Sequence, residues 1–93
     1  MKLENKVAIV TGGGKGIGAE ICLRLAKEGA KVVIAEMDIE SGKNTQKKIM
    51  ENGGDAIVVN TNVADEVSVN NMAEEVVKNF NKIDILINNA GIR

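Results

Sequence analysis

The sequence predicts an α/β fold in which helices flank a parallel β-sheet. Short apolar runs alternate with stretches of helical periodicity, in the order β-α-β-α-β-α-β. Apolar residues make up 44% of the 93 residues and are almost all Ala, Val, Ile and Leu, with Phe80 as the only aromatic residue. Strands buried on both faces of a parallel sheet favour such aliphatic residues, and crossover helices connect strands of this kind.

Two strands and two helices are predicted in the first part of the chain. In order, they are the strand Val7–Val10, the helix Gly16–Glu28, the strand Lys31–Ala35 and the helix Asp38–Asn52. In the first helix the apolar residues Ile17, Ile21 and Leu25 recur every four positions, which predicts one apolar face. The second helix is more polar, and Asp38 is its expected N-cap. Its expected apolar contacts are Ile39, Ile49 and Met50.

The second part is expected to add a strand, a helix and a further strand. These are Ala56–Val59, Asp65–Phe80 and Ile83–Ile87. The helix has the clearest periodicity in the chain. Its apolar positions are Val69, Met72, Ala73, Val76, Val77 and Phe80. With no linker or repeat, the pattern predicts a single domain over residues 1–93.

A glycine-rich turn, Thr11–Gly18, joins the first strand to the first helix. We expect Gly12 to adopt a positive φ, Gly16 to leave room for a pyrophosphate, and Gly18 to let the helix lie close to the strand. The helix N-terminus would offer N–H groups to the anion. A flexible turn is the alternative for a glycine cluster alone, but the strand-turn-helix order favours dinucleotide binding. A P-loop is excluded because Gly16 follows Lys15, where Ser or Thr is required.

Polar residues follow the other three strands. Glu36 could accept hydrogen bonds from the adenosine ribose, although a surface glutamate at a strand end is the alternative. Asn62-Val63 and Asn88–Gly91 follow the third and fourth strands and could be plain loops. We expect all of them to contact a ligand, because open α/β sheets bind ligands at the carboxyl ends of their strands. The pattern predicts the N-terminal half of a Rossmann-type doubly wound parallel sheet with strand order 3-2-1-4.

The run Thr11–Gly18 resembles the TGxxxGxG turn of the short-chain dehydrogenase/reductase family, and Asn88–Gly91 resembles its NNAG motif. The resemblance extends from about Lys6 to Arg93, and its general character is similar to that of 3-oxoacyl-carrier-protein reductases. It implies the NAD(P)-binding part of an oxidoreductase that interconverts a carbonyl and a secondary alcohol by hydride transfer. The cofactor-binding residues that it implies are Gly12, Gly14, Lys15, Gly16, Ile17, Gly18, Glu36, Asn62, Val63, Asn89, Ala90 and Gly91.

By this resemblance each group of residues has an expected role. The glycine turn would hold the pyrophosphate, and Glu36 the adenosine ribose. Asn62 and Val63 would flank the adenine, although many relatives have Asp-Val there. The segment Asn89–Gly91 would line the nicotinamide-side ribose and steady the central sheet.

The resemblance places the family's catalytic Ser, Tyr and Lys beyond the NNAG motif. It therefore implies that residues 1–93 are a single partial Rossmann domain, truncated after Asn88–Gly91. This sequence contains no Tyr, so we expect no catalytic residue in it and no turnover by it alone. Two alternatives to an enzyme fragment remain open. One is a non-catalytic nucleotide-binding module, and the other is an interaction module that pairs its exposed sheet edge with a partner.

NAD is the predicted cofactor, with NADP less favoured, because Glu36 would repel the extra phosphate even though Lys15 could reach it.

Composition argues against several other kinds of site and partner. A chain with no His and one Cys has no zinc-type ligand set. The net charge of −1 argues against nucleic acid or membrane partners. No signal-peptide pattern or apolar run of roughly 20 residues is present, so a cytoplasmic protein is expected. Its open sheet edge predicts self-association.

Overall fold

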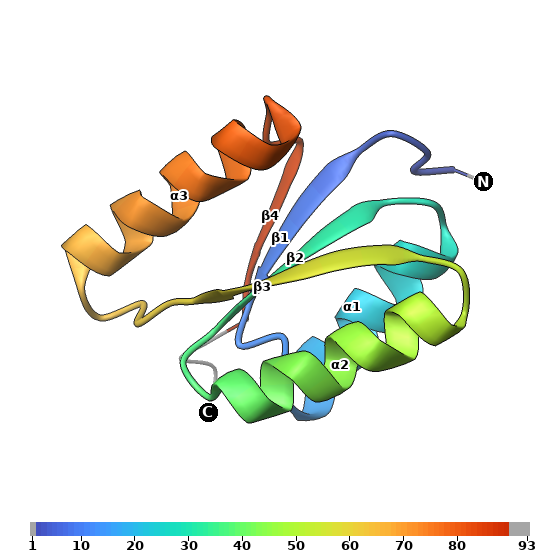
Figure 1. Ribbon diagram of the computed structural model, residues 1–93, viewed down its shortest axis with the longest axis horizontal. Helices are drawn as coiled ribbons and strands as arrows, with labels where there is room; N and C mark the ends of the chain where they lie inside the picture. Colours follow the sequence, from blue (N-terminus) through green and yellow to red (C-terminus); the bar gives the residue numbers. More distant parts are fainter. Residues whose placement is uncertain (1, 90–93) are drawn as a thin grey trace.

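A computed structural model describes residues 2–89 and shows a four-stranded parallel sheet with helices on both faces (Figure 1). In chain order the elements are β1 (Val7–Thr11), α1 (Gly16–Lys27), β2 (Lys31–Glu36), α2 (Ile39–Glu51), β3 (Asp55–Asn60), α3 (Glu66–Phe80) and β4 (Ile85–Asn88). The sheet order β3-β2-β1-β4 confirms the predicted Rossmann-type topology. After β3 the chain crosses to the other side of β1 and adds β4 there. Folds of this kind bind ligands at the point where the strand order reverses, which is between β1 and β4.

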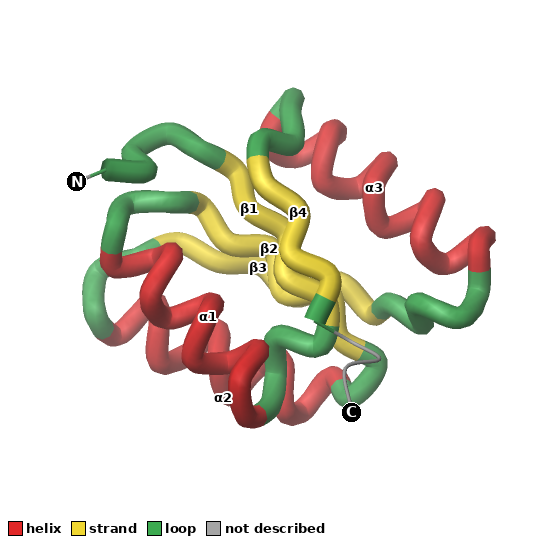
Figure 2. The backbone as a smooth tube through the Cα atoms, turned by 180° about the vertical axis from the view of Figure 1, so that it is seen from behind, coloured by secondary structure: helices red, strands yellow, loops and turns green. Residues whose placement is uncertain are grey.

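The two faces of the sheet are covered by different helices. Helices α1 and α2 lie together on one face, and α3 lies on the other (Figure 2). Successive residues of β1 therefore enter different cores, with Ala8 and Val10 on the α1/α2 side and Val7 and Ile9 on the α3 side. Burial on both faces explains why the strands are continuous apolar runs without polar alternation.

The last strand begins later than its apolar pattern predicts. The sequence predicts a strand over Ile83–Ile87, but β4 starts at Ile85, and Ile83 lies before it and is 40% exposed. The reason is Asp84, whose N–H donates to the Val7 carbonyl at 2.9 Å while its carboxylate accepts from the Val7 N–H, also at 2.9 Å. A side-chain oxygen thus replaces the backbone acceptor that a longer strand would supply.

The predicted apolar face of α1 is confirmed for Ile21 and Leu25, which pack against the core, and is wrong for Ile17. Ile17 is 69% exposed, and the buried residues of the helix are Gly18 and Cys22. Gly18 packs so closely on Gly12 that only a glycine fits there, and Ile17, one residue earlier, lies about 100° away around the helix axis. In α2, similarly, Met50 is exposed while Thr45 is buried, and in α3 Val77 is exposed.

Strand β4 is the edge next to β1, and among the described strands it pairs with β1 alone. Ile85 and Ile87 pack against the core under α1 and α2. Leu86 points to the opposite face, because side chains alternate along a strand, and it is 63% exposed there. Within residues 2–89, none of the helices has the length and apolar character needed to cross a membrane.

Candidate cofactor-binding site

The predicted polar loops lie at one edge of the sheet. The parallel register aligns the last residue of β1, Thr11, with Ala35 of β2 and with Asn88 of β4. Glu36 is aligned in turn with Asn60, the last residue of β3. The glycine turn, Glu36, the loop after β3 and Asn89 therefore all follow their strands at the carboxyl edge of the sheet, as the sequence predicts.

The glycine turn doubles back tightly under the start of α1. Gly12 has a φ of 67°, the positive value that we expected from the turn. A Cβ on Gly18 would overlap the carbonyl oxygen of Gly12 and would lie 2.6 Å from the side-chain nitrogen of Asn89. The close approach of the helix to Gly12 and Asn89 thus requires glycine at this position.

The N-terminus of α1 is open to an anion. Gly16 has a φ of 50°, and a Cβ added there would meet no protein atom within 4 Å. Lys15 occupies the N-cap position without a side-chain capping bond, and the first turn holds no acidic residue. By contrast, Asp38 and Asp65 cap α2 and α3. The first N–H groups of α1 therefore keep their hydrogen-bonding capacity and their partial positive charge for a ligand.

The NNAG motif is tied to the glycine turn. The side-chain amide of Asn89 donates a hydrogen bond to the carbonyl of Gly12 at 3.3 Å. One residue earlier, the Thr11 hydroxyl donates to the side-chain oxygen of Asn88 at 3.1 Å. Asn89 therefore holds the turn against β4. Ala90 and Gly91, which the sequence also predicts as cofactor-binding residues, lie outside the described residues.

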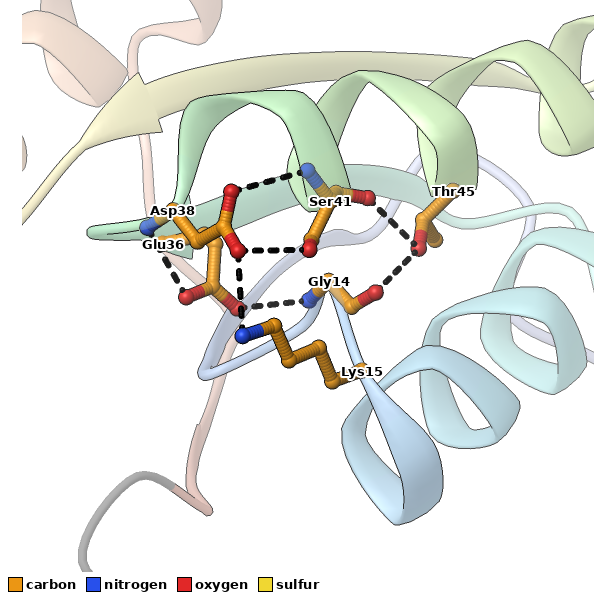
Figure 3. A network of polar contacts seen from close by, with 6 residues as sticks. All are labelled: Gly14, Lys15, Glu36, Asp38, Ser41 and Thr45. Atoms are coloured by element: carbon orange, nitrogen blue, oxygen red, sulfur yellow. Dashed lines mark hydrogen bonds and ion pairs between the residues drawn. The ribbon is translucent and has the colours of Figure 1, made fainter.

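Glu36 fastens the same turn from the other side (Figure 3). One oxygen of its carboxylate accepts the N–H of Gly14 at 2.9 Å, and the other accepts the N–H of Asp38 at 3.1 Å. Sequence reasoning predicted Glu36 as a ribose acceptor and missed this bracing role. The two functions are compatible, because an ionised carboxylate offers about four lone pairs.

Lys15 and Asp38 form an ion pair across the mouth of the turn, with 3.0 Å between Nζ and Oδ2. Asp38 also caps α2 as predicted, since its carboxylate accepts the N–H of Ser41 at 3.2 Å and the Ser41 hydroxyl at 2.9 Å. The hydrogen bond from Lys15, followed by those from Ser41, lowers the pKa of Asp38 from 3.8 to about 2. The same contact raises the pKa of Lys15.

This lowered pKa predicts acid sensitivity. In the unfolded chain an Asp has an ordinary pKa of about 4, so the stabilisation from ionised Asp38 is complete above that pH and is lost as the pH falls towards 2. We expect urea titrations at pH 5 and pH 2.5 to show a smaller loss of unfolding free energy for Asp38→Asn than for the unmodified chain. Lys15→Gln, which removes the largest cause, should act in the same direction. Equal losses in all three proteins would contradict the assignment.

The residues after β3 form their own turn. The side-chain oxygen of Asn62 accepts the N–H of Ala64 at 3.0 Å, and its backbone N–H donates to the Ser68 hydroxyl at 2.9 Å. Val63 is 41% exposed. The structure thus places both residues at the predicted edge and leaves the side chain of Val63 accessible there. Their contact with adenine stays a prediction.

Packing requires two further glycines whose steric role the sequence did not reveal. A Cβ on Gly14 would lie 2.8 Å from the backbone nitrogen of Gly42 in α2. A Cβ on Gly13 would lie 2.7 Å from the sulfur of Cys22. Burial, followed by the charge of Glu36, raises the pKa of the Cys22 thiol to about 12, so it packs as a neutral group. The only sequence signal for these contacts is the presence of a glycine, Gly42, inside a predicted helix.

The topology, the glycine turn and the open N-terminus of α1 define a Rossmann-type nucleotide-binding domain. Residues 6–93 match the family model described as short chain dehydrogenase. The chain belongs to the short-chain dehydrogenase/reductase family, as its motifs predicted. Among the described residues, no group of three or more His, Cys, Asp or Glu side chains is placed to hold a metal ion.

Known proteins of this family are similar to the chain over nearly its whole length. An uncharacterized oxidoreductase of Thermotoga maritima is 50% identical over 90 residues, which are 97% of this chain and 35% of that protein. The structure of NAD⁺-bound xylitol dehydrogenase is 37% identical with a TM-score of 0.94, covering 99% of this chain and 35% of that one. A short chain dehydrogenase from Burkholderia cenocepacia in complex with NADP is 42% identical with a TM-score of 0.92, covering 99% and 38%. The chain therefore spans about a third of the length of these relatives.

Proposed function

We propose that the chain is the dinucleotide-binding part of an oxidoreductase that interconverts a carbonyl and a secondary alcohol. The observation that carries this proposal is the start of α1, where an uncapped helix N-terminus faces the open space beside Gly16. A pyrophosphate fits such a place because backbone N–H groups and the helix dipole both favour an anion. The nicotinamide of the bound dinucleotide would supply or accept the hydride.

The residues around this cradle orient the cofactor. Asn89 and Glu36 hold the glycine turn from its two sides, so the first turn of α1 is presented in one fixed position. Glu36 would use its remaining lone pairs for the adenosine ribose. Val63, exposed after β3, would contact the adenine together with Asn62. The chemistry at the substrate is not assigned to these residues, since the family's Tyr has no counterpart among the 93 residues.

The similarity to 3-oxoacyl-carrier-protein reductases remains a prediction, and so does the substrate class. The two hydroxyl-bearing serines of the sequence, Ser41 and Ser68, both make local contacts at the start of helices. Neither is part of the proposed cradle. We therefore propose that these 93 residues bind the cofactor without turning over a substrate by themselves.

NAD(H) is the proposed cofactor, and we expect the chain to bind NAD⁺ at least about tenfold more tightly than NADP⁺. Glu36 and Asp38 carry two negative charges against the one positive charge of Lys15, so the group has a net charge of −1 towards a 2′-phosphate. Tenfold corresponds to about 1.4 kcal/mol, which one uncompensated charge near a phosphate can supply. Isothermal titration calorimetry with both dinucleotides measures the ratio. Tighter binding of NADP⁺ would refute the preference, and binding of neither would refute the proposed function.

A further inference from the structure

The ion pair between Lys15 and Asp38 lies where the glycine turn meets the start of α2 (Figure 3). Lys15 is the one cation among the six residues of this network, and its side chain is 68% exposed. A mobile lysine in a glycine turn would be free to turn towards a ligand phosphate. Here its ammonium instead points at the carboxylate of Asp38.

Asp38 is itself held in place. Its two oxygens accept the N–H and the hydroxyl of Ser41, and its own N–H donates to Glu36. The partner of Lys15 is therefore a fixed carboxylate at the N-terminus of a helix, and the ammonium is drawn to a defined point. Glu36, which would hold the adenosine ribose, is bonded to both Gly14 and Asp38, so the ribose would lie beside this pair.

We propose that Asp38 is a specificity-determining residue, which disfavours the 2′-phosphate of NADP by neutralising and holding Lys15. This inference rests on the proposed function, because it concerns the same dinucleotide site. Two effects act in the same direction. The carboxylate repels the phosphate directly, and it keeps the lysine from approaching it.

The charge count gives the size of the effect. Lys15, Asp38 and Glu36 together carry a net charge of −1, which becomes zero in Asp38→Asn. NADP⁺, whose 2′-phosphate has a charge near −2, should therefore bind Asp38→Asn about tenfold more tightly than the unmodified chain. The lost negative charge and the released ammonium of Lys15 both favour the phosphate. NAD⁺ lacks the phosphate, so its affinity should change much less.

A double-mutant cycle tests the proposal. The dissociation constants of NAD⁺ and NADP⁺ are measured for the unmodified chain, Asp38→Asn, Lys15→Gln and the double variant. Asn is a good N-cap, so Asp38→Asn removes the charge and keeps an acceptor for Ser41. We expect Asp38→Asn to shift the ratio of the two constants at least about tenfold towards NADP⁺, and Lys15→Gln to abolish most of that gain in the double variant.

Asp65→Asn is the matched control. Asp65 caps α3 in the way that Asp38 caps α2, accepting the N–H of Val67 at 3.0 Å, so this variant makes the same chemical change away from the ion pair. Its cofactor ratio should stay within threefold of the unmodified value. Asp38→Ser, which keeps a different capping oxygen, should reproduce the shift of Asp38→Asn and guards against a folding defect in one variant.

The outcomes separate the two proposals. A ratio in both Asp38 variants that stays within threefold of the unmodified chain overturns the inference while leaving dinucleotide binding intact. If the double variant keeps the full shift towards NADP⁺ seen in Asp38→Asn, Lys15 has no part in the specificity, and that step of the inference is overturned. Binding of neither dinucleotide to the unmodified chain overturns the proposed function, and the inference with it.

Discussion

Replacing Gly18 by alanine is expected to destabilise the fold by about 2–3 kcal/mol and to abolish dinucleotide binding. The added methyl group would overlap the carbonyl oxygen of Gly12 and would come within 2.6 Å of the amide nitrogen of Asn89. Both atoms belong to the contact that ties the turn to β4, so α1 and the turn would have to move apart. Urea unfolding and calorimetry with NAD⁺ measure the two effects.

Gly53→Ala is the matched control for this experiment. Gly53 has a φ of 84°, and a Cβ there would meet no atom within 4 Å, so the substitution brings backbone strain without a collision. It should destabilise the chain by about 1 kcal/mol and leave cofactor affinity unchanged, because it lies in the turn after α2 at the other edge of the sheet. Similar effects of the two substitutions would show that the close contact at Gly18 does not matter.

The isolated chain is expected to self-associate, and Leu86→Lys is expected to make it monomeric. Strand β4 pairs with β1 on one side, and Leu86 is 63% exposed on the face that it shares with α3. An open strand edge with an exposed leucine favours pairing with a second copy of the chain, and a lysine there is a common way to prevent such pairing. Sedimentation velocity over a range of concentrations measures the change.

Met50→Lys provides the comparison for Leu86→Lys. Met50 is 54% exposed on α2, so this variant adds the same charge in place of an exposed apolar side chain away from the sheet edge. It should sediment like the unmodified chain. A monodisperse, unmodified monomer whose amides in β4 are strongly protected from hydrogen exchange would disprove the expected association.

The sequence by itself determined the order of the elements, the strand order and the position of the glycine turn at which we propose that the cofactor binds. These properties depend on local patterns. Apolar runs such as Lys31–Ala35 predict buried strands, alternation with helices predicts parallel crossovers, and the spacing of Gly12, Gly16 and Gly18 predicts a tight turn before a helix. Every predicted element was found within two residues of its expected bounds.

Only the tertiary structure decided which atoms meet at the site and where the last strand begins. The carboxylate of Asp84 accepts a hydrogen bond from Val7, 77 positions earlier in the sequence, at the point where β4 begins. The carboxylate of Glu36 accepts one from Gly14, 22 positions earlier. Ile17 lies outward because its neighbour Gly18 makes the close contact with Gly12 and Asn89. Such contacts follow from the packing of distant segments, which periodicity does not encode, and that is why the pairing of Lys15 with Asp38 became visible only in the folded chain.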